Sequence, residues 1–430
     1  MDVHGSGIAL CTSVEDGDIS YTDLHVVWIC KFSAYPGHPS NLSCVPGQLT
    51  SSVTSQRHAR PKLHDNVMIA LRHPDRVCDI DLSLLTSSII RRIAELVQVP
   101  FLAMKSIRMT SKDAEEPPVL GNFLGGSAPL LERINLDGIA IPFPAIRRLL
   151  LSTSHLNTLR LVKIPNTCYF SPEDLVTCVA ALVHLKDLYV GFHSPASRPN
   201  PSSMARPPPP RRATLHSLVT LSFYGASEYL EEFSARIDCP VLTFLWIQYF
   251  YQLIFEIPQL LQFISRVDGL KSPGEVVVNP DATYPSLSLL RRGIGRCWDC
   301  YFKIPCSQLD WQLSFSTQIL HQLSPLLSGV HLLSIIKPSS LTGNEDIDPT
   351  QWLELFQPLS QTSEVHVSTK ELVPDVVRAL VSEDIMATGI LLGLTSLHLK
   401  GYRESKFAME AAERWVSTRK HAGGNILLSG

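Results

Sequence analysis

The sequence has little net charge and little charge overall. Lysine and arginine number 37, aspartate and glutamate 40, and charged residues make up 18% of the 430 residues against 45% hydrophobic residues. A near-neutral chain sets up no large field to attract nucleic acid or an anionic membrane, so we expect neither as a partner. The apolar share is enough to bury a sizeable core and too high for a mostly disordered chain.

Clustered cysteine is also missing. The ten cysteines are scattered along the chain and do not form the dense disulfide framework of a small secreted domain. The first 20 residues lack the basic segment and long apolar core of a secretory signal. We therefore expect an intracellular protein, cytoplasmic or nuclear, with reduced thiols.

The common catalytic and nucleotide-binding motifs are absent. The sequence contains no G-x-S-x-G, no H-E-x-x-H and no G-x-x-x-x-G-K-[ST]. A G-x-G begins at Gly293 and Gly295, but Trp298 stands where the third glycine belongs. An indole there would block the close helix–strand packing that dinucleotide binding needs. We predict that the chain is not an enzyme and takes no cofactor.

One cysteine pair has the spacing of a zinc knuckle or a redox motif. Cys297 and Cys300 form a C-x-x-C, with Cys306 nearby. The sequence has no second C-x-x-C to complete a metal site. In a strand, a three-residue offset puts the two thiols on opposite faces. Structural thiols are therefore the favoured interpretation, and no metal is predicted.

An uninterrupted apolar run long enough to span a membrane is missing as well. The best candidate, residues 241–264, contains five glutamine or glutamate residues, with Pro258 in its second half. Polar groups at this density are costly in lipid. The segment instead predicts a buried strand, a turn and a helix that starts near Pro258.

What the chain does contain is a repeated pattern, apolar-x-x-apolar-x-apolar. Its starting residues lie 27, 27, 25, 29, 33 and 24 apart, close to the roughly 20–29 residues of a leucine-rich repeat. The copies are Val77/Ile80/Leu82, Met104/Ile107/Met109, Leu131/Ile134/Leu136, Leu156/Leu159/Leu161, Leu185/Leu188/Val190, Leu218/Leu221/Phe223 and Leu242/Leu245/Ile247. Seven near-even copies indicate one stacked strand–turn–helix array rather than isolated buried strands.

Helical patterns separate these strands. Residues 83–97 and 227–237 have apolar residues at helical spacing, and Ser171 with Pro172 forms a helix start. The C-terminal half keeps the alternation, with strands expected near 275–278, 298–304, 330–336, 365–367 and 397–399, and helices near 310–327, 350–358, 371–381 and 407–419. The predicted fold is an α/β leucine-rich-repeat-like solenoid with a curved parallel sheet and helices on its outer face. An irregular α/β sandwich is the alternative.

Two segments stand apart from residues 65–430, the predicted solenoid. Residues 1–64 are rich in Ser, Gly, Pro and Thr without sustained periodicity, and we expect an irregular or disordered segment. Residues 195–212 hold seven prolines and four arginines, which predicts an exposed loop, partly polyproline II. Within it, PPPPRR satisfies P-x-x-P-x-R, the pattern of a ligand for an aromatic groove, but a solvated loop that tolerates proline is the favoured interpretation.

From about Asp65 onward the sequence resembles the fungal group of F-box and leucine-rich-repeat proteins. The resembling stretches are HPDRVCDIDL, FLGGSAPLLERINLDGI, SPEDLVTCVAAL, SEYLEEFSARIDCPVL, FEIPQLLQFISR, LDWQLS and PTQWLELFQP. In that group an F-box precedes the repeats and docks the protein to a ubiquitin-ligase scaffold, while the repeats present a substrate. Residues 1–64 lack the Leu-Pro start and the Cys-Arg-x-Trp-like end of an F-box. The resemblance therefore covers the repeat region and implies its fold.

The predicted sheet lines the concave face of the solenoid, and the residue between the last two apolar positions of each repeat should point into that concavity, toward a partner. This row, the predicted partner-binding row, reads Asp81, Arg108, Asn135, Arg160, Tyr189, Ser222 and Trp246. Arg108, Arg160, Tyr189 and Trp246 are of the types that dominate binding hot spots. We predict a non-catalytic protein-interaction module whose partner is a protein. The alternatives are a ubiquitin-ligase substrate receptor and an enzyme without a recognisable motif.

Three C-terminal strands each carry a histidine that we align to the same repeat position: His331, His366 and His398. If the strands are adjacent and in register, the imidazoles lie on one face at about 4.8 Å spacing. They would then replace flat aromatic rings, form a pH-sensitive partner surface, or hold a metal as a three-histidine site. The pH-sensitive surface and the metal site both require that the three side chains share one face of one sheet.

Overall fold

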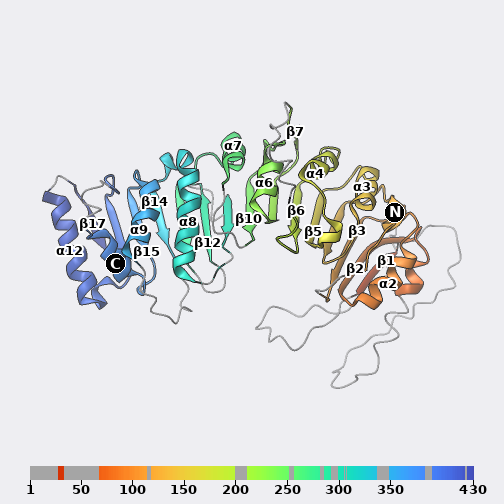
Figure 1. Cartoon of the computed structure of the whole chain (residues 1–430), viewed down its shortest axis with the longest axis horizontal. Helices are drawn as coiled ribbons and strands as arrows, with labels where there is room; N and C mark the ends of the chain where they lie inside the picture. The colour runs from red at the N-terminus through yellow and green to blue at the C-terminus, as the bar shows by residue number, and fades with distance from the viewer. Residues whose placement is uncertain are drawn as a thin grey trace, which may run out of the picture. The chain divides into compact units, whose positions relative to one another are not determined.

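The computed structural model of the chain describes residues 28–32, 67–113, 118–198, 211–250, 256–280, 285–291, 299–304, 306, 308–336, 348–382, 390–421 and 424–430. The chain divides into two compact units, and Figure 1 labels the helices and strands. Unit 1 comprises residues 1–170 and 177–197, and unit 2 comprises residues 171–176 and 198–430. Most of the Pro/Arg-rich segment and most of residues 1–64 lie outside the described residues.

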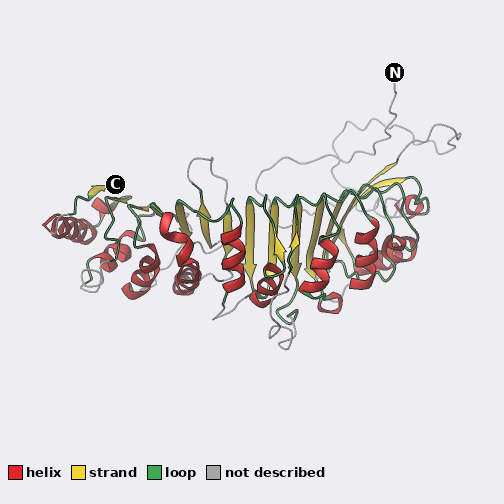
Figure 2. Ribbon diagram, turned by 90° about the horizontal axis from the view of Figure 1, so that it is seen from above, coloured by secondary structure: helices red, strands yellow, loops and turns green. Residues whose placement is uncertain are grey.

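Unit 1 is built on a mostly parallel sheet with the strand order β1-β2-β3-β4-β5-β6. The first strand pairs antiparallel with β2, and each later pair is parallel. In Figure 2 the helices of the unit lie on one side of these strands. The elements are β1 (Trp28–Phe32), β2 (Val77–Leu85), α2 (Ser87–Leu96), β3 (Ser106–Ser111), η1 (Phe123–Gly126), β4 (Arg133–Asp137), α3 (Phe143–Ser152), β5 (Thr158–Ile164), η2 (Asn166–Cys168) and β6 (Asp187–Phe192).

The register of unit 1 follows the sequence repeat. Ile107 pairs with Ile134, which pairs with Leu159, so equivalent residues of successive repeats lie side by side. These three side chains are at most 1% exposed, because they face the helices. Burying this aliphatic face in one continuous core stabilises every repeat through its neighbours.

The same turn leads into three successive strands of unit 1, β4, β5 and β6. The carbonyl of Lys105 accepts from two successive amides of the next repeat, Glu132 and Arg133, at 2.8 and 3.1 Å. The carbonyl of Glu132 does the same one repeat later, and so does that of Asn157. The carbonyl of each turn is thus hydrogen-bonded by main-chain amides of the following repeat. These main-chain contacts fix the strand register without help from side chains.

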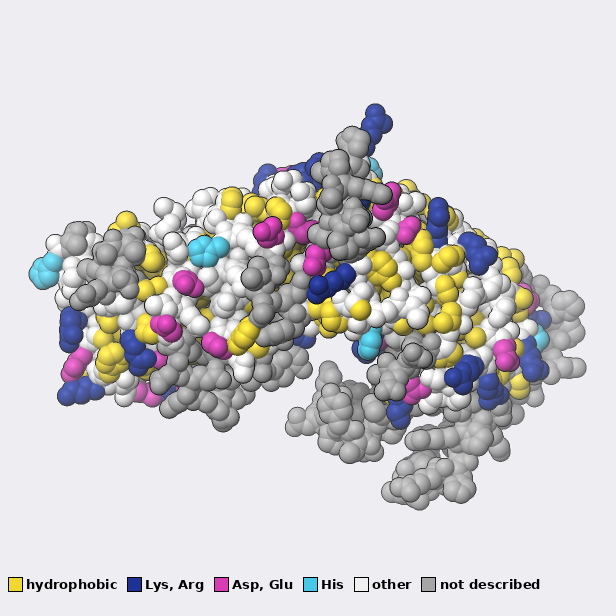
Figure 3. All heavy atoms as spheres, viewed as in Figure 1, with side chains coloured by type: hydrophobic (Ala, Val, Ile, Leu, Met, Phe, Trp, Pro, Cys, Tyr) yellow, Lys and Arg dark blue, Asp and Glu magenta, His cyan; other side chains and the backbone are white. Residues whose placement is uncertain are grey.

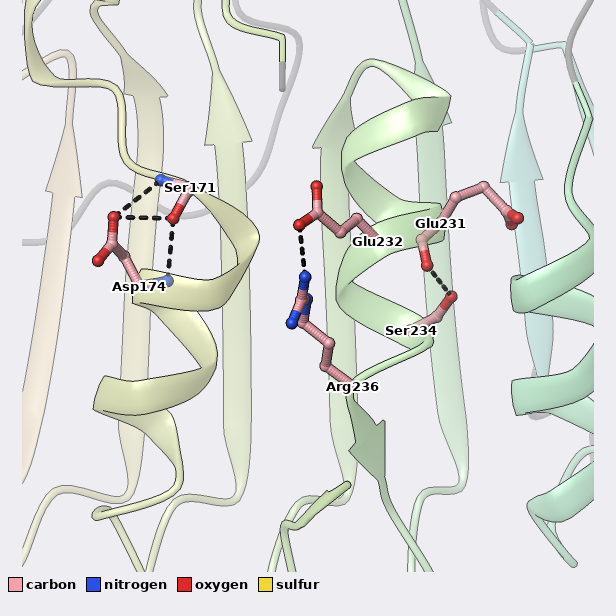
Figure 4. A network of polar contacts seen from close by, with 6 residues as sticks. All are labelled: Ser171, Asp174, Glu231, Glu232, Ser234 and Arg236. Atoms are coloured by element: carbon pink, nitrogen blue, oxygen red, sulfur yellow. Dashed lines mark hydrogen bonds and ion pairs between the residues drawn. The ribbon is translucent and has the colours of Figure 1, made fainter. Parts of the chain in front are cut away.

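The helix between β5 and β6, α4 (Pro172–Val179), begins where the sequence predicts. The Ser171 hydroxyl accepts from the Asp174 amide at 3.1 Å, and the Asp174 carboxylate accepts from the Ser171 amide at 3.4 Å and from the Ser171 hydroxyl at 2.8 Å (Figure 4). This reciprocal pair is a capping box in which aspartate stands at the third helical position. The acidic first turn also suits the positive end of the helix.

Unit 2 carries a longer sheet with the strand order β8-β10-β13-β12-β11-β14-β15-β16-β17, and a separate two-stranded sheet β7-β9. Its helices again lie on one side of the strands (Figure 2). The strands are β7 (Ala213–Thr214), β8 (Thr220–Gly225), β9 (Ile237–Asp238), β10 (Phe244–Tyr249), β11 (Glu275–Asn279), β12 (Ser286–Leu290), β13 (Cys300–Lys303), β14 (Leu332–Ile335), β15 (Glu364–Val367), β16 (Ser396–Leu399) and β17 (Leu427–Ser429).

The helices of unit 2 match the sequence prediction closely. They are α6 (Ser227–Ser234), α7 (Pro258–Arg266), α8 (Leu309–Leu323), α9 (Pro349–Phe356), α10 (Val373–Leu380) and α12 (Lys406–His421), with 3-10 turns η3 (Ser324–Gly329), η4 (Gln357–Leu359) and η5 (Tyr402–Glu404). The apolar segment 241–264 holds a strand and a helix that starts at Pro258, as predicted. No helix in the described part of the chain is long and apolar enough to cross a membrane.

The parallel sheet predicted from the repeats is wrong at two places: β1 pairs antiparallel with β2 in unit 1, and a further strand departs from the prediction in unit 2. Strand β12 runs antiparallel to both β11 and β13, and this three-strand meander separates β10 from β14. The repeat pattern does not predict β12, because its segment, Ser286-Leu-Ser-Leu-Leu290, lacks that pattern. Four of its five residues are buried, so both faces of the strand are covered.

A buried carboxylate ties α6 to α7. Glu231 is 8% exposed, and its two carboxylate oxygens accept from the amides of Gln259 and Leu260, at 2.8 and 2.9 Å. These amides belong to the first turn of α7, where free N–H groups and the helix dipole favour an anion. On α6 and just beyond it, Ser234 donates to the Glu231 carbonyl, and Arg236 pairs with Glu232 at 2.8 Å (Figure 4).

This carboxylate should make the stability of unit 2 depend on pH. Burial raises the pKa of Glu231 from 4.5 to about 7, against the lowering effect of the two amides. Between these values the folded chain holds a proton that the unfolded chain has lost, so the free energy of unfolding falls as pH rises. The total change is up to about 3 kcal/mol. Urea unfolding of the wild type and of Glu231→Gln at pH 4.5, 5.5, 6.5 and 7.5 measures it, and equal pH slopes in the two proteins would contradict it.

Candidate functional site

In unit 1 the predicted partner-binding row is a physical row. Asp81 pairs with Arg108, Arg108 with Asn135, Asn135 with Arg160, and Arg160 with Tyr189, across β2 to β6. All five alternate with buried apolar residues and point out of the face opposite the helices. The unit therefore presents one side chain per repeat, at equivalent positions, on its open sheet face.

Two contacts orient the charged members of this row. Arg108 Nη1 lies 3.9 Å from Asp81 Oδ2, so its side chain leans toward β2. The Arg160 guanidinium lies over the Tyr189 ring, 5.3 Å from its centroid, and leans toward β6. Asn135 stands between these two arginines. The contacts are exposed and weak, and they leave the donors of both guanidinium groups facing solvent.

In unit 2, Ser222 and Trp246 occupy the predicted position of their strands and pair across β8 and β10. The next member is Tyr301 on β13, which pairs with Trp246. The two rings are stacked, with centroids 6.5 Å apart and planes 7° apart. Sequence reasoning missed Tyr301 because its repeat is part of the meander, although Cys300 and Phe302 on either side show the alternation of a half-buried strand.

The histidines are only partly placed as predicted. His366 and His398 pair across β15 and β16, with ring centroids 5.5 Å apart in an edge-on arrangement. His366 Nε2 lies 3.8 Å from a Glu364 carboxylate oxygen, and His398 Nδ1 lies 3.1 Å from the Ser429 hydroxyl. These two side chains share one sheet face.

His331 does not join them, and its predicted alignment is wrong. The residue that pairs with His366 is Ser334, which lies three positions after His331 in the chain. His331 occupies the turn before β14, where its carbonyl accepts from the amides of Ser363 and Glu364. The segment VHLLSI contains aliphatic-x-aliphatic twice, and the structure buries Leu333 and Ile335 fully while Leu332 stays partly exposed.

Because His331 lies in the turn before β14, the three histidines do not share one sheet face, which two of the histidine interpretations require. Both the three-histidine metal site and the three-ring pH-sensitive surface require one shared face. Within the described residues, no group of three or more His, Cys, Asp or Glu side chains could hold a metal ion. What the geometry leaves is a pair, His366 and His398, beside Glu364.

The remaining candidates for chemistry are buried or apolar. Cys300 is 1% exposed, and burial raises the pKa of its thiol well above the ordinary value. Cys297, its proposed partner, lies outside the described residues. One pocket of unit 1 has no titratable group in its lining, which consists of Leu136, Ile139, Ile141, Ile146, Leu161, Val162, Ile164 and Phe170.

These features define a mixed α/β repeat protein with an open sheet face in each unit. No protein-family model matches the chain, and no curated protein matches it in sequence. Its structure is similar to the leucine-rich repeat-containing protein LegL7 from Legionella pneumophila, at 12% identity, over 79% of this chain and 91% of that one, with a TM-score of 0.30. A score that low carries no argument, so the repeat assignment depends on the strand register and the repeated turn described above.

Proposed function

We propose that this chain is a non-catalytic protein-interaction module that presents the sheet face opposite its helices to a protein partner. The observation that supports it is the register of the partner-binding row: Arg108, Arg160 and Tyr189 in unit 1, and Trp246 in unit 2, each at the outward position of its strand. Arginine, tyrosine and tryptophan carry large contact areas at low entropic cost and dominate measured hot spots.

The stacked pair Trp246 and Tyr301 is the strongest candidate anchor in unit 2. Each ring is half-buried, so its orientation is held by the sheet before any partner arrives. Little rotamer freedom is then lost on binding, and the apolar ring faces gain from losing water. By contrast, the helix side of the molecule shows acidic, basic and apolar side chains interspersed over its surface (Figure 3).

Removing this anchor should weaken partner capture. We expect Trp246→Ala to lower the amount of protein retained from an extract of the source organism by at least tenfold, the size of a hot-spot truncation. Quantitative mass spectrometry of material captured by the immobilised full chain measures the loss. Trp311→Ala is the matched control, because Trp311 is 37% exposed and lies on helix α8. Equal retention by both variants would contradict the proposal.

A substrate-receptor role in a ubiquitin ligase is the narrower form of the same proposal. It is supported by the sequence resemblance alone. Pull-down of a ubiquitin-ligase scaffold adaptor by the full chain tests it directly. Capture of the adaptor would support this role, and failure under conditions where a known F-box protein binds would remove it.

A further inference from the structure

The open face of unit 1 carries a second outward row beside the partner-binding row. Ser106 on β3 pairs with Arg133 on β4, which pairs with Thr158 on β5. These residues precede Arg108, Asn135 and Arg160 by two positions, so they point to the same side of the sheet. The six side chains form a grid of two rows and three strands, which we call the donor grid.

Every side chain of the donor grid can donate a hydrogen bond, and none is acidic. It offers three guanidinium groups, two hydroxyls and one carboxamide. Arg108, Arg133 and Arg160 are all exposed. Within the described residues Arg133 has no carboxylate at ion-pair distance, and Arg108 has only the 3.9 Å contact with Asp81. The three guanidinium groups thus make the grid a positive surface, whereas the Thr158 hydroxyl already donates to Asn157 Oδ1 at 3.0 Å.

Carboxylates frame the grid on both sides. Asp79 and Asp81 lie on β2, next to Ser106 and Arg108, and Asp187 lies on β6, next to Thr158. This frame limits what can bind. A long polyanion such as RNA or an anionic membrane would extend beyond the three central strands and meet the flanking carboxylates, and such like-charge contacts are unfavourable.

The three arginines of the grid also lie apart from one another and do not converge on a single point. Strands lie about 4.8 Å apart, so the backbones of Arg108 and Arg160 are about 10 Å apart, with Arg133 about 8 Å from each. Arg108 leans toward Asp81 and Arg160 toward Tyr189, in opposite directions. One compact dianion could not contact both guanidinium groups in these positions. Separate carboxylates, which alternate residues of an extended peptide place about 7 Å apart, fit the spacing better.

We propose that the donor grid of unit 1 binds a short acidic segment of a protein, with two or three Asp or Glu side chains at alternate positions. This inference rests on the proposed function and specifies the chemistry of the partner at this face. Arg133 is the central contact, because it lies between the other two arginines and has no competing ion pair among the described residues. Arginine–carboxylate pairs are often bidentate, which gives such a site directional specificity.

The test uses the full chain and a fluorescein-labelled peptide of glycine and serine with three glutamates at alternate positions, followed by fluorescence anisotropy at low salt. We expect the peptide to bind, with an affinity that falls as salt rises. The same peptide with glutamine in place of glutamate should bind at least tenfold more weakly. Arg133→Gln should lower the affinity for the acidic peptide at least tenfold. Arg147→Gln, which removes the same charge from the exposed side of helix α3, should change it less than twofold.

Several outcomes would overturn the inference. Equal affinities of the Arg133→Gln and Arg147→Gln variants would show that only net charge matters. Tighter binding of a peptide with a single phosphoserine, or of single-stranded RNA, would assign the grid to a compact dianion or to a polyanion. If the acidic peptide fails to bind while Trp246→Ala still loses captured protein, the inference fails and the proposed function stands. If Trp246→Ala loses nothing, the proposed function itself fails.

Discussion

Gly125→Ala should destabilise unit 1 by about 2–5 kcal/mol, a large effect for the addition of one methyl group. Gly125 lies in η1 with φ of +56°, where an L side chain costs about 1–2 kcal/mol. A Cβ at this position would also lie 2.5 Å from the backbone nitrogen of Pro100 and 2.6 Å from the carbonyl carbon of Val99. Backbone atoms cannot rotate away, so the turn itself must shift, which adds an overpacking cost.

The turn has little freedom to shift because the preceding repeat holds it. The Asn122 side-chain amide donates to the Gln98 carbonyl at 2.8 Å, and the Phe101 amide donates to the Ser127 carbonyl at 3.2 Å. Leu124, also at positive φ, is fully buried. Gly121→Ala is the matched control, since its added methyl group would have no atom within 4 Å and its φ is not positive. Urea unfolding should separate the two variants clearly, and equal midpoints would show that η1 is not locked.

Trp352→Ala should lower the free energy of unfolding of unit 2 by about 3–5 kcal/mol, the usual cost of removing a large buried aromatic side chain. Trp352 lies on α9 and is fully buried, and its ring centroid is 6.3 Å from that of Phe356. The neighbouring Phe356 and Leu355 are equally buried, so little can move into the cavity without disturbing the helix packing. The lost transfer energy and the residual cavity therefore add.

The same substitution at an exposed tryptophan of the same unit provides the comparison. Trp311 is 37% exposed on α8, and Trp311→Ala should cost much less than Trp352→Ala. Guanidinium unfolding followed by circular dichroism measures both changes. A cost at Trp352 below about 1.5 kcal/mol would mean that α9 does not pack as the structure shows, because that is the range of surface or volume-conserving changes.

The repeat architecture could be predicted because each strand carries its own signal. The buried positions of β4 and β5, Ile134 with Leu136 and Leu159 with Leu161, are those of the sequence pattern. Helix α7 could be placed because Pro258 is suited only to a first turn within that apolar run. Strand β12 could not be placed, because its short segment lacks the repeat pattern and the structure buries residues on both of its faces.

The residues of the candidate site could be predicted where the sequence of a strand fits only one alignment to the repeat pattern. The row from Asp81 to Trp246 follows from seven similar repeats, whereas VHLLSI around His331 fits two registers with equal apolar content. The donor grid was missed for a different reason. The repeat pattern singles out the residue between its last two apolar positions, whereas Arg133 precedes both of those positions. Its outward direction follows from alternation alone, but its position between Arg108 and Arg160 requires the pairing of three strands.

The sequence by itself determined the local elements: the spacing of the repeats, the face each strand buries, and the helix starts at Ser171 and Pro258. These depend on alternation, capping and proline, which act over a few residues. Only the tertiary structure decided which strands are neighbours, and hence the antiparallel meander β11–β13 and the stacking of Tyr301 on Trp246. It also decided that Ser334, and not His331, lies beside His366. Pairing joins residues far apart in the chain, and its register depends on the total apolar area buried, which no single segment specifies.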